Sequence, residues 1–489
     1  MVGREKGWRA AAVLLLAAGL WWWRGSGQAA ARQDAGIWSP PQFLFETTGR
    51  ASEPEIIVDN AGTVHVFWAY GNPENEADGT GQSLYYAQQQ NGVWSDPTDI
   101  LVSPGGRVAR MPAVALDERG YLHLAWSGGN AIYYSRAYAT EAGAPQGWAE
   151  PAAFTLYVAA YEPDVVAVGD DVYLLWTEAS NGLVFARSAD GGRHWTPPRT
   201  IFAAPGAQEL ARWGRLAVDG AGRLHVALSL VRDNDLAAPR ADPIYMVYLR
   251  SENAGSTWTD PWLIAPEPDY GEVTVITHGA NDVHLFWNGR AGTHGRYHRQ
   301  SPDGGQTWSD VETVVAAGSP LGLGGLTGFP AVVVDARGDL HLVSTSNPQN
   351  FYTRWHNGTW SDPVVISDGV RGAGVTGASV NMEMPSLALG QGNQLYAVFH
   401  DGQERIWTTG YTLDLPAVPP HPLATVTPMP AATITTAPPP APTNTPMPTF
   451  PRAAPAPLAS PYASLLWGLA SAGIFLTLAL LIARARHIP

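Results

Sequence analysis

Apolar and polar residues alternate in short runs along most of this chain, and the runs return at regular intervals. The segments M-P-A-V-A-L-D-E-R-G-Y-L-H-L-A-W from Met111 and F-P-A-V-V-V-D-A-R-G-D-L-H-L-V-S from Phe329 each hold a proline, an alternating strand, a polar turn and a second strand. Alternation with a period of two indicates a half-buried β-strand. Related starts lie at Pro54, Pro163, Gly214, around Glu272 and at Pro385.

A turn that ends in tryptophan recurs between these strand pairs. It is S-A-D-G-G-R-H-W from Ser188, S-E-N-A-G-S-T-W from Ser251 and S-P-D-G-G-Q-T-W from Ser301, with shortened relatives elsewhere. A third strand leads into the turn, so each unit holds about four short strands over roughly 55 residues, which is typical of propeller blades. Seven tryptophans align at intervals of 47 to 63 residues: Trp38, Trp94, Trp148, Trp195, Trp258, Trp308 and Trp360.

The ends of the repeat indicate how the ring closes. Trp38 precedes the first proline strand, while the last proline strand, from Pro385, has no tryptophan turn after it. We therefore expect the segment from Ile37 to Glu46 to supply the outer strand of the final blade. The prediction is an all-β, seven-bladed β-propeller of four-stranded blades closed by the N-terminal strand. Six blades remain the alternative, if one weak repeat is an insertion.

The two ends of the chain have the patterns of targeting and anchoring segments. Residues 1–31 place Arg4, Lys6 and Arg9 before an apolar run, as in a secretory signal peptide, with an uncleaved anchor as the alternative. The propeller is expected over residues 32–415, and a Pro/Ala/Thr-rich stalk over 416–461. A transmembrane helix is expected over 462–483, with a basic cytoplasmic tail over 484–489. This order predicts a single-pass type I membrane protein with the propeller outside the cytoplasm.

Composition and charge exclude several classes of function. The chain has 489 residues and a formal net charge of -14, which argues against nucleic acid as a partner. It contains no cysteine, so disulfides, thiolate zinc sites and a cysteine nucleophile are excluded. We expect no cofactor and no metal.

The turn S-x-D-G-G-x-x-W resembles the Asp-box, or BNR repeat, of the sialidase-like β-propeller family, and the resemblance covers about residues 36–415. It implies a structural turn between the third and fourth strands of a blade. The residue chemistry agrees, because a short acceptor can bond nearby amides and glycine can adopt a positive φ. A calcium loop would need more oxygen ligands than this turn offers. The residues assigned this role are Ser188, Asp190, Gly192, Trp195, Ser251, Trp258, Ser301, Asp303, Gly305 and Trp308.

One position in each repeat, in the strand that follows the polar turn, is a histidine or a tyrosine. A metal site would gather its ligands in one place, whereas these residues are distributed one to each blade. A packing and hydrogen-bonding role is favoured over metal ligation. The residues are His65, His123, Tyr173, His225, His284, His341 and Tyr396.

The face opposite the Asp-boxes, here called the front face, is where we expect a ligand, because many loops converge there on a rigid frame. Its segments mix carboxylates, arginines and aromatic rings, which suits sugars. Solvated loops without a ligand are the alternative. The candidate ligand-binding residues are Glu53, Arg110, Glu162, Arg212 and Glu383.

Catalysis is weakly indicated. Sialidases of this family hold the substrate carboxylate with three arginines, and Arg110-Met111-Pro112 resembles their Arg-Ile-Pro motif, although it falls in the second repeat. Tyr270 and Glu272 could supply a nucleophile pair, but no family motif marks them. Three hypotheses follow: a surface propeller that binds a glycan or protein ligand outside the cell, an exo-α-sialidase that uses Arg110, and a structural ectodomain.

Overall fold

The computed structural model describes residues 37–421, apart from gaps at 47–49, 72–81, 105–107, 130, 156–158, 179–181, 207–208, 233–241, 266–269, 290–294, 317–326, 347–348, 368–369, 371–383 and 402–404. The expected signal peptide (1–31), transmembrane helix (462–483) and tail (484–489) lie outside the described residues, as does the stalk beyond 421. Within the described ranges, no helix has the length and apolar character needed to cross a bilayer.

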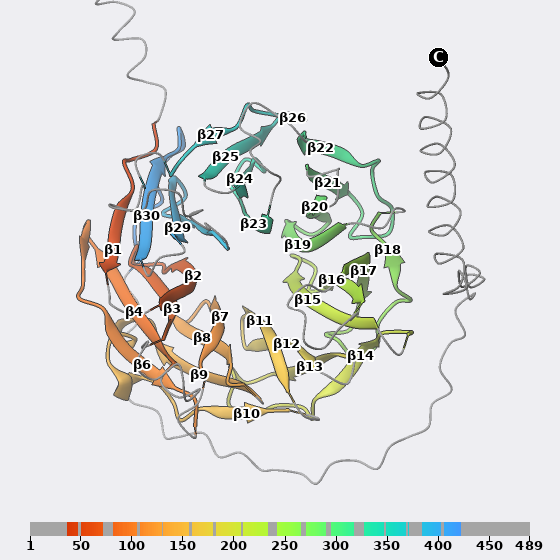
Figure 1. Cartoon of the computed structure of the whole chain (residues 1–489), viewed down its shortest axis with the longest axis horizontal. Coiled ribbons are helices and arrows are strands. Elements are labelled where there is room, and N and C mark those ends of the chain that lie inside the picture. The colour runs from red at the N-terminus through yellow and green to blue at the C-terminus, as the bar shows by residue number, and fades with distance from the viewer. Residues whose placement is uncertain are drawn as a thin grey trace, which may run out of the picture. The chain divides into compact units, whose positions relative to one another are not determined.

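Seven separate antiparallel sheets surround a central axis, and each sheet is one blade (Figure 1). Blade 1 holds β2 (Arg50–Val58), β3 (Val64–Gly71), β4 (Gln82–Gln90), β5 (Val93–Trp94) and β6 (Thr98–Val102). Blade 2 holds β7 (Arg110–Leu116), β8 (Tyr121–Ser127), β9 (Ile132–Tyr138) and β10 (Ala152–Phe154), with the short 3-10 helices η1 (Ala139–Glu141) and η2 (Pro145–Gly147) before β10. Blade 3 holds β11 (Ala160–Val168), β12 (Asp171–Glu178), β13 (Gly182–Ser188) and β14 (Arg199–Ala203).

The remaining four blades repeat the same order of strands. Blade 4 holds β15 (Glu209–Val218), β16 (Leu224–Arg232), β17 (Asp242–Ser251) and β18 (Trp262–Leu263). Blade 5 holds β19 (Tyr270–His278), β20 (Asp282–Gly289), β21 (Arg296–Ser301) and β22 (Glu312–Val315). Blade 6 holds β23 (Thr327–Val334), β24 (Leu340–Ser346), β25 (Gln349–His356), β26 (Thr359–Trp360) and β27 (Val364–Val365). Blade 7 holds β28 (Ser386–Gly390), β29 (Gln394–His400), β30 (Arg405–Thr412) and β1 (Gln42–Glu46).

The ring is closed by the N-terminal strand, as the repeat predicted. β1 pairs antiparallel with β30, and the two lie side by side in Figure 1 as the red and blue strands of one blade. Ser39 extends the seam, because its amide donates to the carbonyl of Gly410 at 2.8 Å. The prediction of seven four-stranded blades is therefore confirmed, and the six-bladed alternative is excluded.

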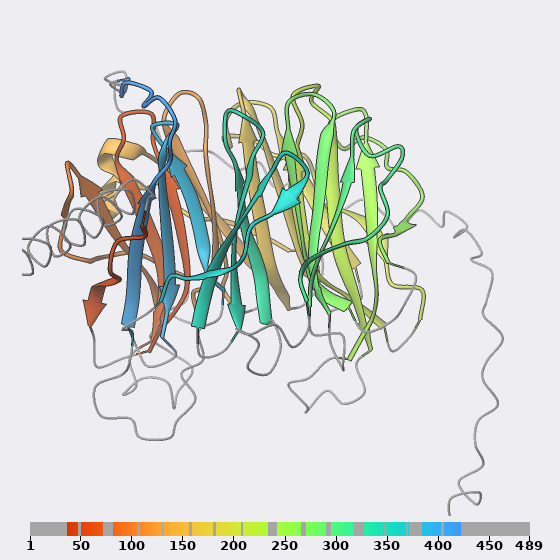
Figure 2. The same ribbon diagram turned by 90° about the horizontal axis from the view of Figure 1, so that it is seen from above.

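The Asp-box turns lie on the face of the ring opposite to the front face. The turn of blade 3 contacts the hairpin between the inner two strands of its own blade, where the Gly191 amide donates to the carbonyl of Asp170 at 2.8 Å. In blade 5 the Gly304 amide donates in the same way to Asn281 at 2.8 Å. Inner strands therefore begin at the front face and end at the Asp-box face, as the side view in Figure 2 lets the reader follow.

The tryptophan that ends each turn packs between blades. The ring of Trp195 in blade 3 lies 4.9 Å from Tyr134 of blade 2, and Trp308 of blade 5 lies 5.0 Å from Tyr248 of blade 4, measured between ring centroids. Both pairs meet edge to face, a favoured geometry for aromatic rings. The same contact with the preceding blade is made by Trp148 on Phe67, Trp258 on Phe185, Trp360 on Phe286 and Trp38 on Tyr352.

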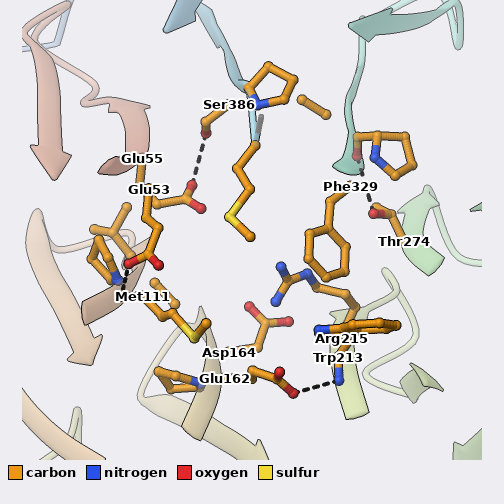
Figure 3. Close-up of a pocket in the computed structure, with 18 of the residues that line it drawn as sticks. Glu53, Glu55, Met111, Glu162, Asp164, Trp213, Arg215, Thr274, Phe329 and Ser386 are labelled. Carbon is orange, nitrogen blue, oxygen red and sulfur yellow. Dashed lines mark hydrogen bonds between the residues drawn. The ribbon is translucent and has the colours of Figure 1, made fainter. Parts of the chain in front are cut away.

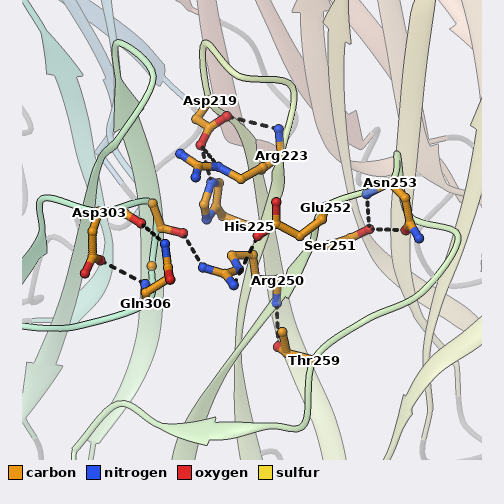
Figure 4. A network of polar contacts seen from close by, with 12 residues as sticks. Asp219, Arg223, His225, Arg250, Ser251, Glu252, Asn253, Thr259, Asp303 and Gln306 are labelled. Carbon is orange, nitrogen blue, oxygen red and sulfur yellow. Dashed lines mark hydrogen bonds and ion pairs between the residues drawn. The ribbon is translucent and has the colours of Figure 1, made fainter.

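The recurring histidine joins an aspartate to a tyrosine inside the blade, and Figure 4 shows the aspartate side of this contact in blade 4. In blade 4, His225 Nδ1 accepts the Tyr248 hydroxyl at 2.6 Å, while Nε2 donates to Asp219 Oδ2 at 3.1 Å. Burial lowers the pKa of His225, so the ring is neutral and each nitrogen has one partner. Blades 1, 2 and 6 repeat the tyrosine bond, through His65 with Tyr86, His123 with Tyr134 and His341 with Tyr352.

Each complete Asp-box closes on this tyrosine of the preceding blade. In blade 5, Ser301 Oγ accepts the amide of Gly305 at 2.8 Å, which holds that glycine at a φ of +82°. A Cβ on Gly305 would lie 1.9 Å from the Tyr248 hydroxyl. Arg250 of blade 4 completes the contact, since its Nη1 donates to the Gly304 carbonyl at 2.9 Å (Figure 4). The turn thus joins two blades.

The middle copy shows what happens when both partners change. In blade 4, Asn253 replaces the aspartate, and its Oδ1 still accepts the Thr257 amide at 2.8 Å. The neighbouring blade 3 has Phe185 where blades 1, 2, 4 and 6 have the tyrosine. A phenyl ring offers no hydroxyl to the turn. The asparagine in the turn of blade 4 and the phenylalanine in blade 3 therefore lie on the two sides of one junction between blades.

We expect Gly192→Ala to destabilise the protein more than Gly222→Ala. Both glycines have a φ near +80°, but a Cβ on Gly192 would lie 1.8 Å from the Tyr134 hydroxyl, whereas nothing lies within 4 Å of one on Gly222. The backbone strain, about 1 kcal/mol, is common to both changes. Overpacking adds about 1–3 kcal/mol at Gly192 alone. Denaturant unfolding monitored by tryptophan fluorescence measures the difference; equal losses of stability would show that the turn does not pack on the preceding blade.

Candidate functional site

The inner strands share an unusual backbone feature close to their first residues. In blades 1 to 6 the register between the first and second strands shifts at this point, as in a β-bulge. The bulge places bulky residues at positive φ, a conformation that costs of order 1–3 kcal/mol each and tends to cluster at functional sites. The residues are Glu53, Met111, Glu162, Trp213 and Glu272, with Gly328 in the same conformation in blade 6; Met384, just before β28 of blade 7, also has a positive φ.

The bulges place two rows of side chains around the axis, where they line one pocket of about 310 Å³ (Figure 3). This volume is at the lower end of the range for ligand sites. The rim row, nearer the front face, contributes Glu53, Met111, Glu162, Trp213, Phe329 and Met384. The inner row, two residues further along each strand, contributes one residue from each blade in order: Glu55, Ala113, Asp164, Arg215, Thr274, Ala331 and Ser386.

The carboxylates of the rim row hold the bulge of the next blade. Glu53 accepts the amide of Met111, and Glu162 Oε2 accepts the amide of Trp213 at 2.8 Å. Glu162 is 5% exposed and also binds the Arg212 guanidinium, whose Nε lies 2.8 Å from Oε1. These bonds stabilise the strained residues on the far side of each blade junction.

The inner row carries the charges deepest in the pocket. Glu55 accepts the Ser386 hydroxyl at 2.9 Å, across the junction between blades 1 and 7. Asp164 Oδ2 accepts the amide of Leu216 at 2.7 Å, across the junction between blades 3 and 4. The Arg215 guanidinium lies 4.1 Å from the ring centroid of Phe329, a cation–π contact. With the described residues, Arg215 forms no hydrogen bond and no ion pair within 4.0 Å.

Burial shifts the protonation of both inner carboxyls. Desolvation raises the pKa of Glu55 to about 7, although the Ser386 hydroxyl and the charge of Arg215 oppose the shift. Desolvation also raises the pKa of Asp164, against the charge of Arg215 and the Leu216 amide. Glu55 is therefore only partly ionised at neutral pH, and can accept or donate a hydrogen bond to a ligand.

The residues proposed from the sequence fall at different distances from this pocket. Glu53 and Glu162 line it, whereas Arg212 lies outside the lining and is bound to Glu162. Arg110 is exposed at the start of β7 and is not in the lining. Among the described lining residues Arg215 is the single arginine.

The two catalytic candidates lie two residues apart at the start of β19. Tyr270 begins β19, but its side chain lies outside the described residues. Glu272 has a φ of +55° at the bulge and accepts a hydrogen bond from Asn288 Nδ2. Glu383 also lies outside the described residues.

Sequence reasoning missed Glu55, Asp164 and Arg215, the three charged residues of the inner row. The sequence did contain a signal, because E-P-E from Glu53 and E-P-D from Glu162 each place a carboxyl directly after the proline of the inner strand. Recognising it requires knowing that this position faces the axis in every blade, which the bulge decides.

We expect Glu55→Gln to raise the melting temperature at pH 8 by about 2–4 °C and to leave it unchanged near pH 4. The raised pKa means that folding favours the protonated carboxyl. The stability that the protonated Glu55 carboxyl contributes is fully present below pH 4.5, is lost as the pH rises through about 7, and stays lost above that pH. Thermal unfolding at several pH values measures the effect, with Glu118→Gln at an exposed turn as the control. A difference between wild type and variant that does not change with pH would contradict the assignment.

Comparisons with known proteins support the fold. No family model matches the chain, and no curated protein matches its sequence. An ulvan lyase of polysaccharide lyase family PL25 is 11% identical over 76% of this chain and 95% of that chain, with a TM-score of 0.50. The Hadza microbial sialidase Hz136 is 14% identical over 74% and 66% of the two chains, with a TM-score of 0.42. An α-L-arabinanase from Penicillium chrysogenum is 11% identical over 77% and 98%, with a TM-score of 0.45.

Of these three structures, the ulvan lyase, at a TM-score of 0.50, is the one whose likeness supports the fold. At such low identity the likeness concerns the fold and leaves the function to be argued from the site.

Proposed function

We propose that the propeller binds a saccharide in its axial pocket. The observation that carries the proposal is the make-up of the pocket: a charged and hydroxyl-bearing inner row lies below a rim that includes Trp213 and Phe329. Sugar hydroxyls need both donors and acceptors, and a flat ring packs against the apolar face of a pyranose. The strained rim also supports a ligand site, because such backbone conformations concentrate at functional positions.

The same geometry favours binding over sialidase chemistry. Recognition of a sialic acid carboxylate in the manner of the family would require three arginines at one place. The described lining contains Arg215 alone, while Arg110 and Arg212 lie outside it. The proposal is therefore a binding propeller, and Arg110 has no part in it.

We also propose that this propeller is displayed outside the cytoplasm on a membrane anchor. The support is the sequence: the leader over 1–31, the Pro/Ala/Thr-rich stalk over 416–461 and the uncharged run within 462–483.

The full-length chain should stay in the membrane fraction after an alkaline carbonate wash, because a helix of about 20 apolar residues does not leave the bilayer. A chain ending at residue 421 should be recovered in the soluble fraction. Recovery of the full-length chain in the wash would contradict the anchor.

Trp213→Ala should weaken saccharide binding by at least about tenfold, since it removes the rim's largest ring. The measurement is a glycan array followed by calorimetry on the full-length protein in a detergent without sugar headgroups. The matched control is Arg110→Ala, which changes an exposed residue of the same face and should leave the affinity unchanged. Loss of binding in Arg110→Ala but not in Trp213→Ala would refute the axial site and favour the sialidase interpretation.

A further inference from the structure

The axial pocket has an excess of negative charge. Its lining contains the carboxyls of Glu53, Glu55, Glu162 and Asp164 against the single guanidinium of Arg215. The two rim carboxylates have structural partners, because Glu53 holds an amide and Glu162 holds both an amide and Arg212. The inner-row carboxyls of Glu55 and Asp164 each accept one hydrogen bond from a neighbouring blade, lie deeper in the pocket and keep further acceptor capacity for a ligand.

The order of the inner row separates its charges into two sides of the pocket. Going round the ring, Glu55 belongs to blade 1, Ala113 to blade 2 and Asp164 to blade 3. Ala113 has the smallest side chain that is not hydrogen, so the inner row places no large side chain between the two carboxyls. Figure 3 shows Glu55 and Asp164 on two sides of this space, and Arg215 with Phe329 on a third.

Arg215 packs on Phe329 and faces the two inner carboxyls from a third side of the pocket. The guanidinium lies 4.1 Å from the centroid of that ring, which belongs to blade 6. Its charge acts on both Glu55 and Asp164, but among the described residues it forms no ion pair within 4.0 Å with either, so both carboxyls can still accept from a ligand group. Arg215 can still donate to ring or hydroxyl oxygens from its own side.

We propose that the axial pocket selects a saccharide that carries a protonated amino group, such as an unacetylated hexosamine, with the ammonium between Glu55 and Asp164. This inference rests on the proposed function. An ammonium has three donors and no acceptor, and it faces two carboxyls that can accept. A carboxylate or sulfate in the same space would meet like charge, and an N-acetyl group would leave the carboxyl charges unpaired.

The protonation of the empty pocket is consistent with this selection. Glu55 has its pKa raised to about 7 mainly by burial, with further contributions from the neighbouring Asp164 and Glu53 charges. A bound cation acts in the opposite direction and lowers that pKa. Binding an ammonium near pH 6, where Glu55 is mostly protonated, therefore releases close to one proton. The other ionisable groups facing Glu55 are Asp164 and Arg215 in the inner row, with Glu53 and Glu162 at the rim.

The test compares two ligands that differ only in charge. Glucosamine tetrasaccharide and its fully N-acetylated counterpart are titrated at pH 6 into the full-length protein in a detergent without sugar headgroups. We expect the amino form to bind at least about tenfold more tightly, a difference of about 1.4 kcal/mol. Repeating the titration in buffers of different ionisation enthalpy should show proton release for the amino form only.

Two substitutions connect the preference to the pocket. Glu55→Gln and Asp164→Asn keep the size of each side chain, remove one charge, and should each reduce the preference for the amino form severalfold. Glu55→Gln should also abolish the proton release, while Asp164→Asn should retain it. Asp362→Asn, at an exposed residue outside the axial lining, serves as the charge-matched control and should change neither quantity.

The outcomes separate this inference from the proposed function. If the N-acetylated tetrasaccharide or a tetragalacturonate binds more tightly than the amino form, and Trp213→Ala removes that binding, the inference is overturned and the saccharide site stands. An amino preference that survives both Glu55→Gln and Asp164→Asn also overturns it, because the attraction would then come from the overall charge. If no saccharide on the array or in the titrations binds, the proposed function fails and this inference fails with it.

Discussion

The structure depends on the contact between one blade and the next. A four-stranded blade cannot bury both of its faces alone, so its core is completed by its neighbours. Here the contact is partly polar: an Asp-box of one blade closes on a histidine-supported tyrosine and an arginine of the preceding blade, as with Ser301 and Gly305 against Tyr248 and Arg250. Because these polar groups are paired while buried, the junction is specific as well as cohesive.

A second consequence of the ring is the strain at its front face. Each inner strand must approach the axis closely, and the bulge turns bulky residues such as Met111 and Trp213 into the left-handed region. Carboxylates from the preceding blade, Glu53 and Glu162, bond the amides of these two residues. The strain is therefore maintained by inter-blade hydrogen bonds, and its result is a pocket to which each of the seven blades contributes one inner residue.

The charge in that pocket differs from the expectation raised by the Asp-box resemblance. An arginine cluster would suit an acidic sugar, whereas the described lining places Glu55 and Asp164 against Arg215. The scaffold and the site are thus separable: the Asp-boxes lie on one face and stabilise blade junctions, while the inner row at the axis can change without affecting them.

The sequence by itself determined the fold and the closing strand and favoured seven blades over six, because alternation and the tryptophan turn are local patterns that each blade repeats. It did not reveal the inner row. Bulky residues such as Trp213 seldom adopt a positive φ, and the bulge that results resets which side chains face the axis. Glu55 and Ser386, 331 positions apart in the chain, meet only when the ring closes. The composition of the pocket was therefore decided by tertiary structure, since seven distant strands contribute one residue each.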